Sequence, residues 1–125
     1  MTWTYIGLQE LAAAIKEYEA ELAERLQRAD SDVSAQKVLN EIRAWREFND
    51  AIKVIESRGQ DPEEIFPLLR IGRRRLRNYR LFKKSPFTLI YRRDPVLMTA
   101  MPVLVYHKRD RLKRIQEMIR LLEDS

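Results

Sequence analysis

The sequence predicts an α+β fold made of an N-terminal strand, a long helical hairpin, a three-stranded, mostly antiparallel sheet and a C-terminal helix. Three observations predict it. Apolar residues recur at helical spacing through the first half of the chain, strand-like runs separated by turn residues fill the second half, and helical spacing returns after Asp110. At 125 residues we expect one α+β domain spanning 1–125, with the hairpin at 8–58 and the basic sheet and terminal helix at 73–123.

The first predicted elements are a short strand and a helix. Residues 3–6 alternate as a strand does, and Gly7 ends the alternation. Helical spacing then begins, and its apolar face consists of Leu8, Leu11, Ala12, Ile15, Tyr18, Leu22 and Leu26. The spacing stops after Ala29. The Asp-Ser-Asp sequence at 30–32 predicts a turn and the N-cap of the next helix.

A second helix is predicted from about Val33 to Arg58. Its buried stripe consists of Val38, Ile42, Trp45, Ile52 and Ile55, flanked by Leu39 and Phe48. Gly59 stands where a left-handed residue commonly follows a helix. Two long amphipathic helices joined by about three residues should pack as an antiparallel hairpin. The same spacing indicates that Trp45 and Phe48 are core residues rather than binding residues.

The residues after the hairpin predict a short helix and a sheet. Asp61-Pro62-Glu63-Glu64 is typical of an N-cap, a first-turn proline and an acidic first turn, and Pro67 and Gly72 keep this helix brief. The predicted strands are 73–82, 87–92 and 98–106, with turns at Pro86 and at Asp94-Pro95.

Two features of the last predicted elements are less regular. Pro102 has no N–H to donate to a sheet, so it predicts an edge position, a bulge or a later strand start. Asp110 is expected to cap the terminal helix. The apolar face of that helix consists of Leu112, Ile115, Ile119 and Leu122.

The composition excludes several classes of protein. There is no cysteine, which excludes disulfides, zinc–thiolate sites and thiol catalysis, and the single histidine cannot form a histidine-based metal site. Three scattered glycines make no phosphate loop, so no cofactor is expected. No N-terminal signal peptide and no apolar run of about 18 residues are recognisable, which predicts a cytoplasmic protein without a membrane partner.

Charge is strongly segregated along the chain. Residues 1–69 carry 8 Lys and Arg against 14 Asp and Glu, a net charge of −6, whereas residues 70–125 carry 16 against 5, a net charge of +11. A surface of one sign steers a partner of the opposite sign toward itself. We therefore expect the second half to bind an anionic partner, unless the two halves neutralise each other within the fold.

The basic residues are concentrated between positions 70 and 93, a stretch that contains ten basic side chains and no acid. Arginine binds phosphate through a planar fork and stacks on bases, and Tyr79 and Phe82 are interleaved with the basic residues. The predicted nucleic-acid or anion-binding residues are Arg73, Arg74, Arg75, Arg77, Arg80, Lys83, Lys84, Arg92, Arg93, Lys108 and Arg109. A solvated strand face or a site for an acidic protein would show the same pattern.

His107 is the candidate for proton transfer. It follows the last predicted strand, beside Tyr106, Lys108 and Arg109. Neighbouring cations lower the pKa of a histidine and favour the neutral imidazole, which can accept a proton at pH 7. A histidine that ends a strand and hydrogen-bonds locally is the alternative.

Residues 80–94 contain Pro86-Phe87 and Tyr91-Arg92, and residues 103–110 end in His107-Lys108-Arg109-Asp110. These two segments resemble the C-terminal half of RelE/ParE-type toxins. In this superfamily an arginine-bearing strand leads to a proline–aromatic turn, an apolar strand ends in Tyr-Arg, and the last strand ends in a His-Arg-Arg-Asp-like motif. Pro86-Phe87, Tyr91-Arg92 and His107-Lys108-Arg109-Asp110 match these places. The element order resembles the family over nearly the whole chain. The helices here are longer, and Pro102 and the basic terminal helix depart from the family pattern.

The resemblance implies a bacterial type II toxin–antitoxin system. A cognate antitoxin would bind the toxin, and the target would be ribosome-bound messenger RNA in RelE-like members or DNA gyrase in the non-catalytic ParE-like members. Whether the protein is an enzyme stays open. For the ribonuclease, the resemblance implies Arg80 and Arg92 at the phosphate and His107 or Tyr106 in proton transfer. Adjacent strand residues face opposite ways, so only one of the last two can enter a given site.

Two other functions fit the same residues. One is a non-catalytic nucleic-acid-binding module, whose affinity would fall steeply with salt. The other is a phage virion protein, because Gly7-Leu8-Gln9-Glu10-Leu11 before a long helix resembles neck or tail-completion proteins. In such a protein the acidic half of one copy would contact the basic half of the next, giving a homo-oligomer.

Overall fold

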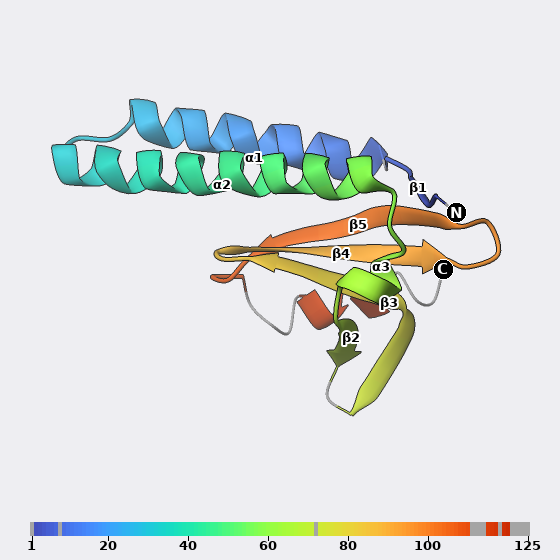
Figure 1. Cartoon of the computed structure of the whole chain (residues 1–125). Helices are drawn as coiled ribbons and strands as arrows, with labels where there is room; N and C mark the ends of the chain where they lie inside the picture. Colours follow the sequence, from blue (N-terminus) through green and yellow to red (C-terminus); the bar gives the residue numbers. More distant parts are fainter. Residues whose placement is uncertain (1, 8, 72, 111–114, 118, 121–125) are drawn as a thin grey trace.

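The protein is described by a computed structural model that covers residues 2–7, 9–71, 73–110, 115–117 and 119–120. The elements in chain order are β1 (Thr4–Tyr5), α1 (Gln9–Gln27), α2 (Asp32–Arg58), α3 (Pro62–Ile65), β2 (Leu68–Ile71), β3 (Arg74–Lys84), β4 (Phe87–Asp94) and β5 (Thr99–His107). The α1–α2 hairpin covers one face of the sheet, and the last helical residues lie on the other side (Figure 1). The predicted α+β fold is confirmed.

The helical hairpin begins and ends at the predicted caps. The Ser31 side chain accepts a hydrogen bond from the Ser34 N–H, which starts α2. Gly59 ends α2 in the left-handed conformation, with φ 60° and ψ 30°. Trp45 and Phe48 are buried as predicted, whereas the flanking Leu39 is exposed. The apolar stripe of α2 therefore rests on the sheet.

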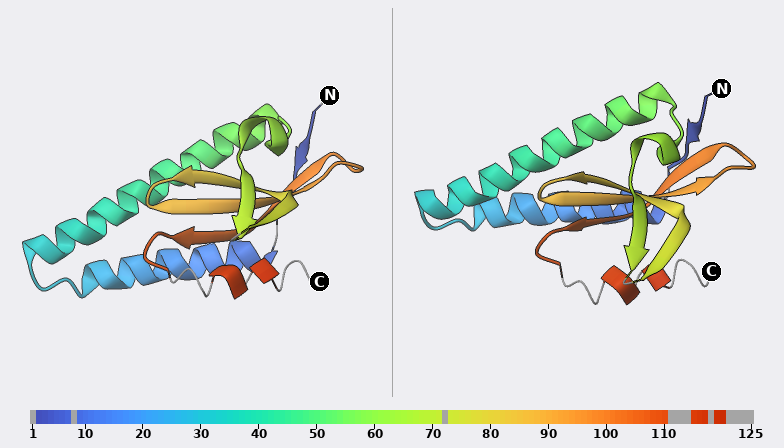
Figure 2. Two further views of the ribbon diagram at one scale, coloured as in Figure 1. Left: turned by 90° about the horizontal axis from the view of Figure 1, so that it is seen from below. Right: turned by 60° about the horizontal axis from the view of Figure 1, so that its bottom comes forward.

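The sheet has five strands rather than the three predicted, in the order β1-β5-β4-β3-β2. β1 pairs parallel with β5, and the other neighbours are antiparallel, which makes the sheet mixed. The sequence predicted no strand at Leu68–Ile71, where β2 pairs with the beginning of β3. This end of the sheet curls away from the α1–α2 hairpin (Figures 1 and 2).

β4 is the central strand, and its residues pack alternately into two hydrophobic clusters. Phe87, Leu89 and Tyr91 pack against the helical hairpin, beside Trp45 and Phe48. Ile90 belongs to the cluster on the opposite face, with Leu76, Tyr79, Leu104, Ile115 and Ile119. Residues 87–91 are all buried for this reason. The last helical residues thus cover the face that the hairpin leaves open.

The turns between the last three strands follow the sequence closely. Pro86 lies in the β3–β4 turn, after a cis Ser85–Pro86 peptide bond. In the β4–β5 turn, Asp94 Oδ1 accepts hydrogen bonds from the N–H groups of Val96 and Leu97. At Pro102 the pairing of β5 with β4 shifts by one residue, so a bulge accommodates the missing N–H.

The terminal helix is confirmed for the residues that the structure describes. Residues 115–117 and 119–120 are helical, and Ile115 and Ile119 are buried as predicted. The other two residues of the predicted apolar face, at 112 and 122, lie outside the described residues. The Asp110 side chain accepts a hydrogen bond from the backbone N–H of His107. This bond closes the turn after β5.

Candidate functional site

Arginines from β3, β4 and the turn before β3 surround one hollow beside α3. Its volume is about 650 Å³. The hollow is lined by Arg73, Arg75, Arg77, Arg80, Arg93, Glu63, Leu68 and Asn78. We call it the arginine hollow. Five arginines and a single glutamate are among the described lining residues, so the site has a large excess of positive charge.

Strand pairing explains why these arginines share one side. Arg80 lies directly opposite Tyr91, so both project toward the face that carries the hairpin. Arg93 follows Tyr91 by two residues and faces the same way. Nearer the start of β3, Leu76 and Tyr79 both contribute to the opposite cluster, although they are three residues apart. The pairing of β2 with β3 is irregular at this point, and the two intervening residues, Arg77 and Asn78, line the hollow.

Arg93 is held by carboxylates at the start of α3. Its Nε and Nη2 donate to the two oxygens of Asp61 at 3.0 and 2.8 Å, and Nη2 lies 3.2 Å from Glu63 Oε2. Burial alone would raise the pKa of Asp61, but the hydrogen bonds from Arg93 and the Glu63 N–H hold that pKa below its usual value. The guanidinium also lies over the Trp3 ring, 4.9 Å from its centroid.

Arg80 is less well compensated than Arg93. Its side chain is only 13% exposed, and its Nη2 lies 3.5 Å from Glu63 Oε1. The Arg80 Nε is buried and has no hydrogen-bond partner among the described residues. Most buried donors in proteins are satisfied, and a buried charged group without full compensation is costly. The charge of Arg80 is therefore only partly compensated by Glu63 among the described residues.

The remaining predicted basic residues lie elsewhere. Arg92 is exposed on the other face of the sheet from Arg93, and its register partner on β3 is Tyr79. Lys83, whose register partner on β4 is Thr88, lies on the same face as Arg92. Lys84 pairs with Phe87 at the other end of β4. Arg74 is exposed at the start of β3, and Lys108 and Arg109 are exposed after β5. The eleven predicted residues therefore do not form one continuous surface.

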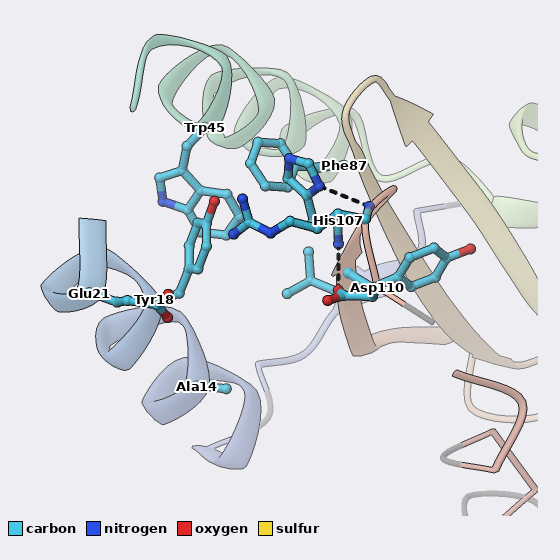
Figure 3. A pocket seen from close by; sticks show the side chains of 10 residues that line it. Ala14, Tyr18, Glu21, Trp45, Phe87, His107 and Asp110 are labelled. Carbon is cyan, nitrogen blue, oxygen red and sulfur yellow. Dashed lines mark hydrogen bonds between the residues drawn. The ribbon is translucent and has the colours of Figure 1, made fainter. Parts of the chain in front are cut away.

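His107 lies in a second, smaller pocket of about 290 Å³ between the hairpin and the end of β5 (Figure 3). The pocket is lined by Ala14, Tyr18, Glu21, Trp45, Phe87, Val105, Tyr106, His107, Arg109 and Asp110. The imidazole contacts the Phe87 ring edge to face, with centroids 5.3 Å apart. Arg109 lies 2.8 Å from Glu41 of α2, which also accepts a hydrogen bond from the Tyr18 hydroxyl.

The hydrogen bonds of His107 determine what its imidazole can do. The Arg109 N–H donates to Nδ1 at 3.0 Å, so the neutral ring carries its proton on Nε2. Burial and the nearby Arg109 charge lower the pKa of His107. The imidazole is therefore neutral at pH 7, as predicted. Its acceptor nitrogen is already engaged, and it presents a hydrogen-bond donor to the pocket rather than a base.

The four residues named for catalysis do not meet. Arg80 and His107 face the hairpin side, and they pair with Tyr91 and Phe87, four residues apart on β4. This spacing corresponds to about 13 Å along the strand. Between them Phe82, Leu89 and Val105 pack against the hairpin. Arg92 pairs with Tyr79, and Tyr106 pairs with Thr88. Arg92 and Tyr106 therefore lie on the face of the sheet that points away from the hairpin.

No sequence pattern assigns Asp61, Glu63 or Glu41 to a site. Asp61 and Glu63 fit a helix start, which they also form, because the Asp61 side chain accepts from the Glu63 N–H at 2.9 Å. Glu41 fits the solvated face of a helix. Burial alone would raise its pKa, but Tyr18, Arg109 and Arg25 together hold the pKa of Glu41 below its usual value. The one available signal was that Asp61, Glu63 and Glu64 are the last acids before the arginine run.

Comparison with known proteins adds no identification. The sequence matches no protein-family model, and a search of curated proteins finds no similar sequence. Across the described residues there is no helix long and apolar enough to cross a membrane. Nor do three or more His, Asp or Glu side chains among them cluster closely enough to bind a metal ion. The fold and the arginine hollow are therefore the basis for a proposed function.

Proposed function

We propose that the protein is a RelE/ParE-like toxin that binds a nucleic-acid target through the arginine hollow. The observation that carries the proposal is the convergence of five arginines around one hollow next to a single lining carboxylate. Guanidinium groups bind phosphate oxygens in pairs, and a closely spaced cluster of them matches a phosphate backbone. Asn78 adds a neutral polar side chain at the same place.

The α+β fold is compatible with this family. A first strand precedes a helical hairpin, and antiparallel strands follow. The positions of the motifs that carry the resemblance support the proposal. Pro86 lies in a turn between two strands, Tyr91-Arg92 lies near the end of the central strand, and His107 ends the last strand. A cognate antitoxin protein is the partner that such a toxin would require.

The geometry favours binding over RNA cleavage at His107. The imidazole Nδ1 accepts a hydrogen bond from the Arg109 N–H. The β4 partners of His107 and Arg80 lie about 13 Å apart along that strand. A general base must reach the proton that it removes, and a phosphate-binding group must lie beside the same reaction centre. We therefore propose that the toxin acts by occupying its target rather than by cutting it.

Inducible expression in a bacterial host tests this function. We expect the wild-type chain to stop growth, Arg80→Gln to relieve the arrest, and His107→Gln to leave it in place. Total RNA from arrested cells should show no new cleavage products, and a DNA-supercoiling readout tests gyrase as a target. Absence of growth arrest with well-folded protein would favour the non-toxic nucleic-acid-binding module. Relief by His107→Gln together with RNA cleavage would favour the ribonuclease.

A further inference from the structure

Glu63 lies between the guanidinium groups of Arg80 and Arg93. Its Oε1 is 3.5 Å from Arg80 Nη2, and its Oε2 is 3.2 Å from Arg93 Nη2. One carboxylate thus bridges two arginines from neighbouring strands at the wall of the hollow. Its side chain is 55% exposed and comes from α3, a helix of four residues. The carboxylate occupies the place where an anionic ligand would contact both arginines.

The two arginines depend on Glu63 to different degrees. Arg93 already forms a two-point ion pair with Asp61, whose side chain is only 15% exposed. Arg80 has Glu63 as its ion-pair partner among the described residues, at a distance longer than the roughly 2.7–2.9 Å of a strong charge-assisted hydrogen bond. Asp61 is therefore a structural partner of Arg93, whereas Glu63 is a weak and accessible partner of Arg80.

We propose that Arg80 and Arg93 form a phosphate-binding subsite whose internal occupant is Glu63, and that a bound phosphate group displaces this carboxylate. This inference rests on the proposed function in that it assigns a ligand to the same hollow. The ligand class is a phosphate monoester or diester. A simple carboxylate would only replace Glu63, whereas a phosphate group offers more acceptor oxygens to the surrounding arginines and to the unsatisfied Arg80 Nε.

Displacement is inexpensive for the fold. Glu63 is exposed and can turn toward water, and Asp61 continues to neutralise Arg93 and to cap α3 when Glu63 leaves. The internal carboxylate competes with every ligand that needs the same arginines. The ion pair is long, and its Glu63 side is exposed to water, so we expect removal of the Glu63 carboxylate to tighten phosphate binding by up to about fivefold. In the absence of a ligand, Glu63 partly neutralises the charge of Arg80.

The matched variants are Glu63→Gln and Glu64→Gln. Both remove one negative charge from α3, and Glu64 is exposed but does not line the hollow. The full chain is titrated with inorganic phosphate, and then with acetate, in chloride buffer at low ionic strength. The signal followed is the NMR resonance of the Arg80 Nε–H, which the variant Arg80→Lys assigns by removing it.

We expect phosphate to shift the Arg80 resonance in the wild-type chain and acetate to shift it far less. Glu63→Gln should bind phosphate up to about fivefold more tightly, and Glu64→Gln should bind like the wild type. Equal affinities in the two variants, or a wild-type Arg80 resonance that phosphate leaves unmoved, would overturn the inference. Phosphate displacing Glu63 in a protein that does not arrest growth would refute the proposed toxin function and leave this subsite standing.

Discussion

Asp61 and Arg93 form a two-point ion pair, with 3.0 Å between Arg93 Nε and Asp61 Oδ1 and 2.8 Å between Arg93 Nη2 and Asp61 Oδ2. The pair joins the start of α3 to the end of β4, and both side chains are largely buried. Asp61 at the same time caps α3, and Arg93 at the same time covers Trp3. One contact thus fixes one side of the arginine hollow and ties the N-terminal residues to the sheet.

Replacing Asp61 should destabilise the protein substantially. Asp61→Asn keeps a side-chain oxygen for the α3 cap but leaves the Arg93 charge without its main partner. A hydrogen bond to a charged group contributes about 1.5–3 kcal/mol, so we expect the free energy of unfolding in urea to fall by about 2–3 kcal/mol. Asp50→Asn, on the exposed face of α2, is the control and should change stability by less than about 0.5 kcal/mol.

Stability should also depend on the charge of the single histidine. Burial and Arg109 make the pKa of His107 lower in the folded chain than its ordinary value of 6.5. As the pH falls through 6.5, the unfolded chain therefore takes up a proton before the folded chain does, and the free energy of unfolding decreases. The decrease ends once the pH is below the folded pKa. His107→Gln should remove this part of the profile, measured by urea unfolding between pH 7.5 and 5.

If the free energy of unfolding of His107→Gln fell as steeply with pH as that of the wild type, or more steeply, this assignment to His107 would be contradicted. Glu56 is the natural comparison, because burial raises its pKa and its contribution has the opposite sign. A group with a raised folded pKa binds its proton first in the folded chain, so it adds stability as the pH falls. Glu56→Gln should therefore make the loss of stability on acidification larger, not smaller.

The two faces of β3 and β4 should differ in nucleic-acid binding. Arg80→Gln and Arg92→Gln each remove one positive charge, but only Arg80 lines the hollow. We expect Arg80→Gln to weaken binding of a labelled 12-nucleotide RNA about tenfold and to reduce the slope of log affinity against log salt by about one. Arg92→Gln should change both much less. Anisotropy titrations between 50 and 200 mM salt measure both quantities. Equal losses in the two variants would mean that the sheet binds through overall charge alone.

Gly59 should tolerate no side chain. It has φ 60°, and an added Cβ would collide with Thr2 Cγ2 and lie 3.1 Å from the Trp3 carbonyl oxygen. The left-handed conformation costs an L-residue about 1–2 kcal/mol, and the collision would disturb the 2.7 Å hydrogen bond from the Trp3 N–H to the Gly59 carbonyl. We expect Gly59→Ala to lower the free energy of unfolding by about 2 kcal/mol or more. Gly7→Ala, with nothing near its Cβ, serves as the control.

Local signals in the sequence predicted most of the elements. Ser31, Gly59 and Asp61 end or begin helices through contacts within a few residues, so the sequence alone reveals them. Pro102 was predicted to mark an edge, a bulge or a strand start, and the bulge is what the sheet contains. β2 could not be predicted. Its Leu-Leu-Arg-Ile sequence has no alternation, and it is a strand only because β3 pairs with it.

The site was less predictable because it depends on contacts between distant residues. The basic run indicated an anion-binding surface, but its separation into two faces depends on the pairing of Arg80 with Tyr91 and of Arg92 with Tyr79. The contact of Arg93 with Asp61 joins residues 32 positions apart. No periodicity shows such a contact. Charge in the sequence thus predicted the kind of partner, and the fold decides which arginines are placed to meet it.

The alternation along β4 has a consequence for Arg92 and Arg93. These neighbours look interchangeable in the sequence, yet only the second reaches the carboxylates of α3. A shift of β4 by one residue, through an insertion or a deletion, would exchange the side chains of its two faces. Thr88 and Ile90 would then lie under the hairpin, and Phe87, Leu89 and Tyr91 would face away from it. Changes in the length of this strand are therefore far more damaging than conservative substitutions within it.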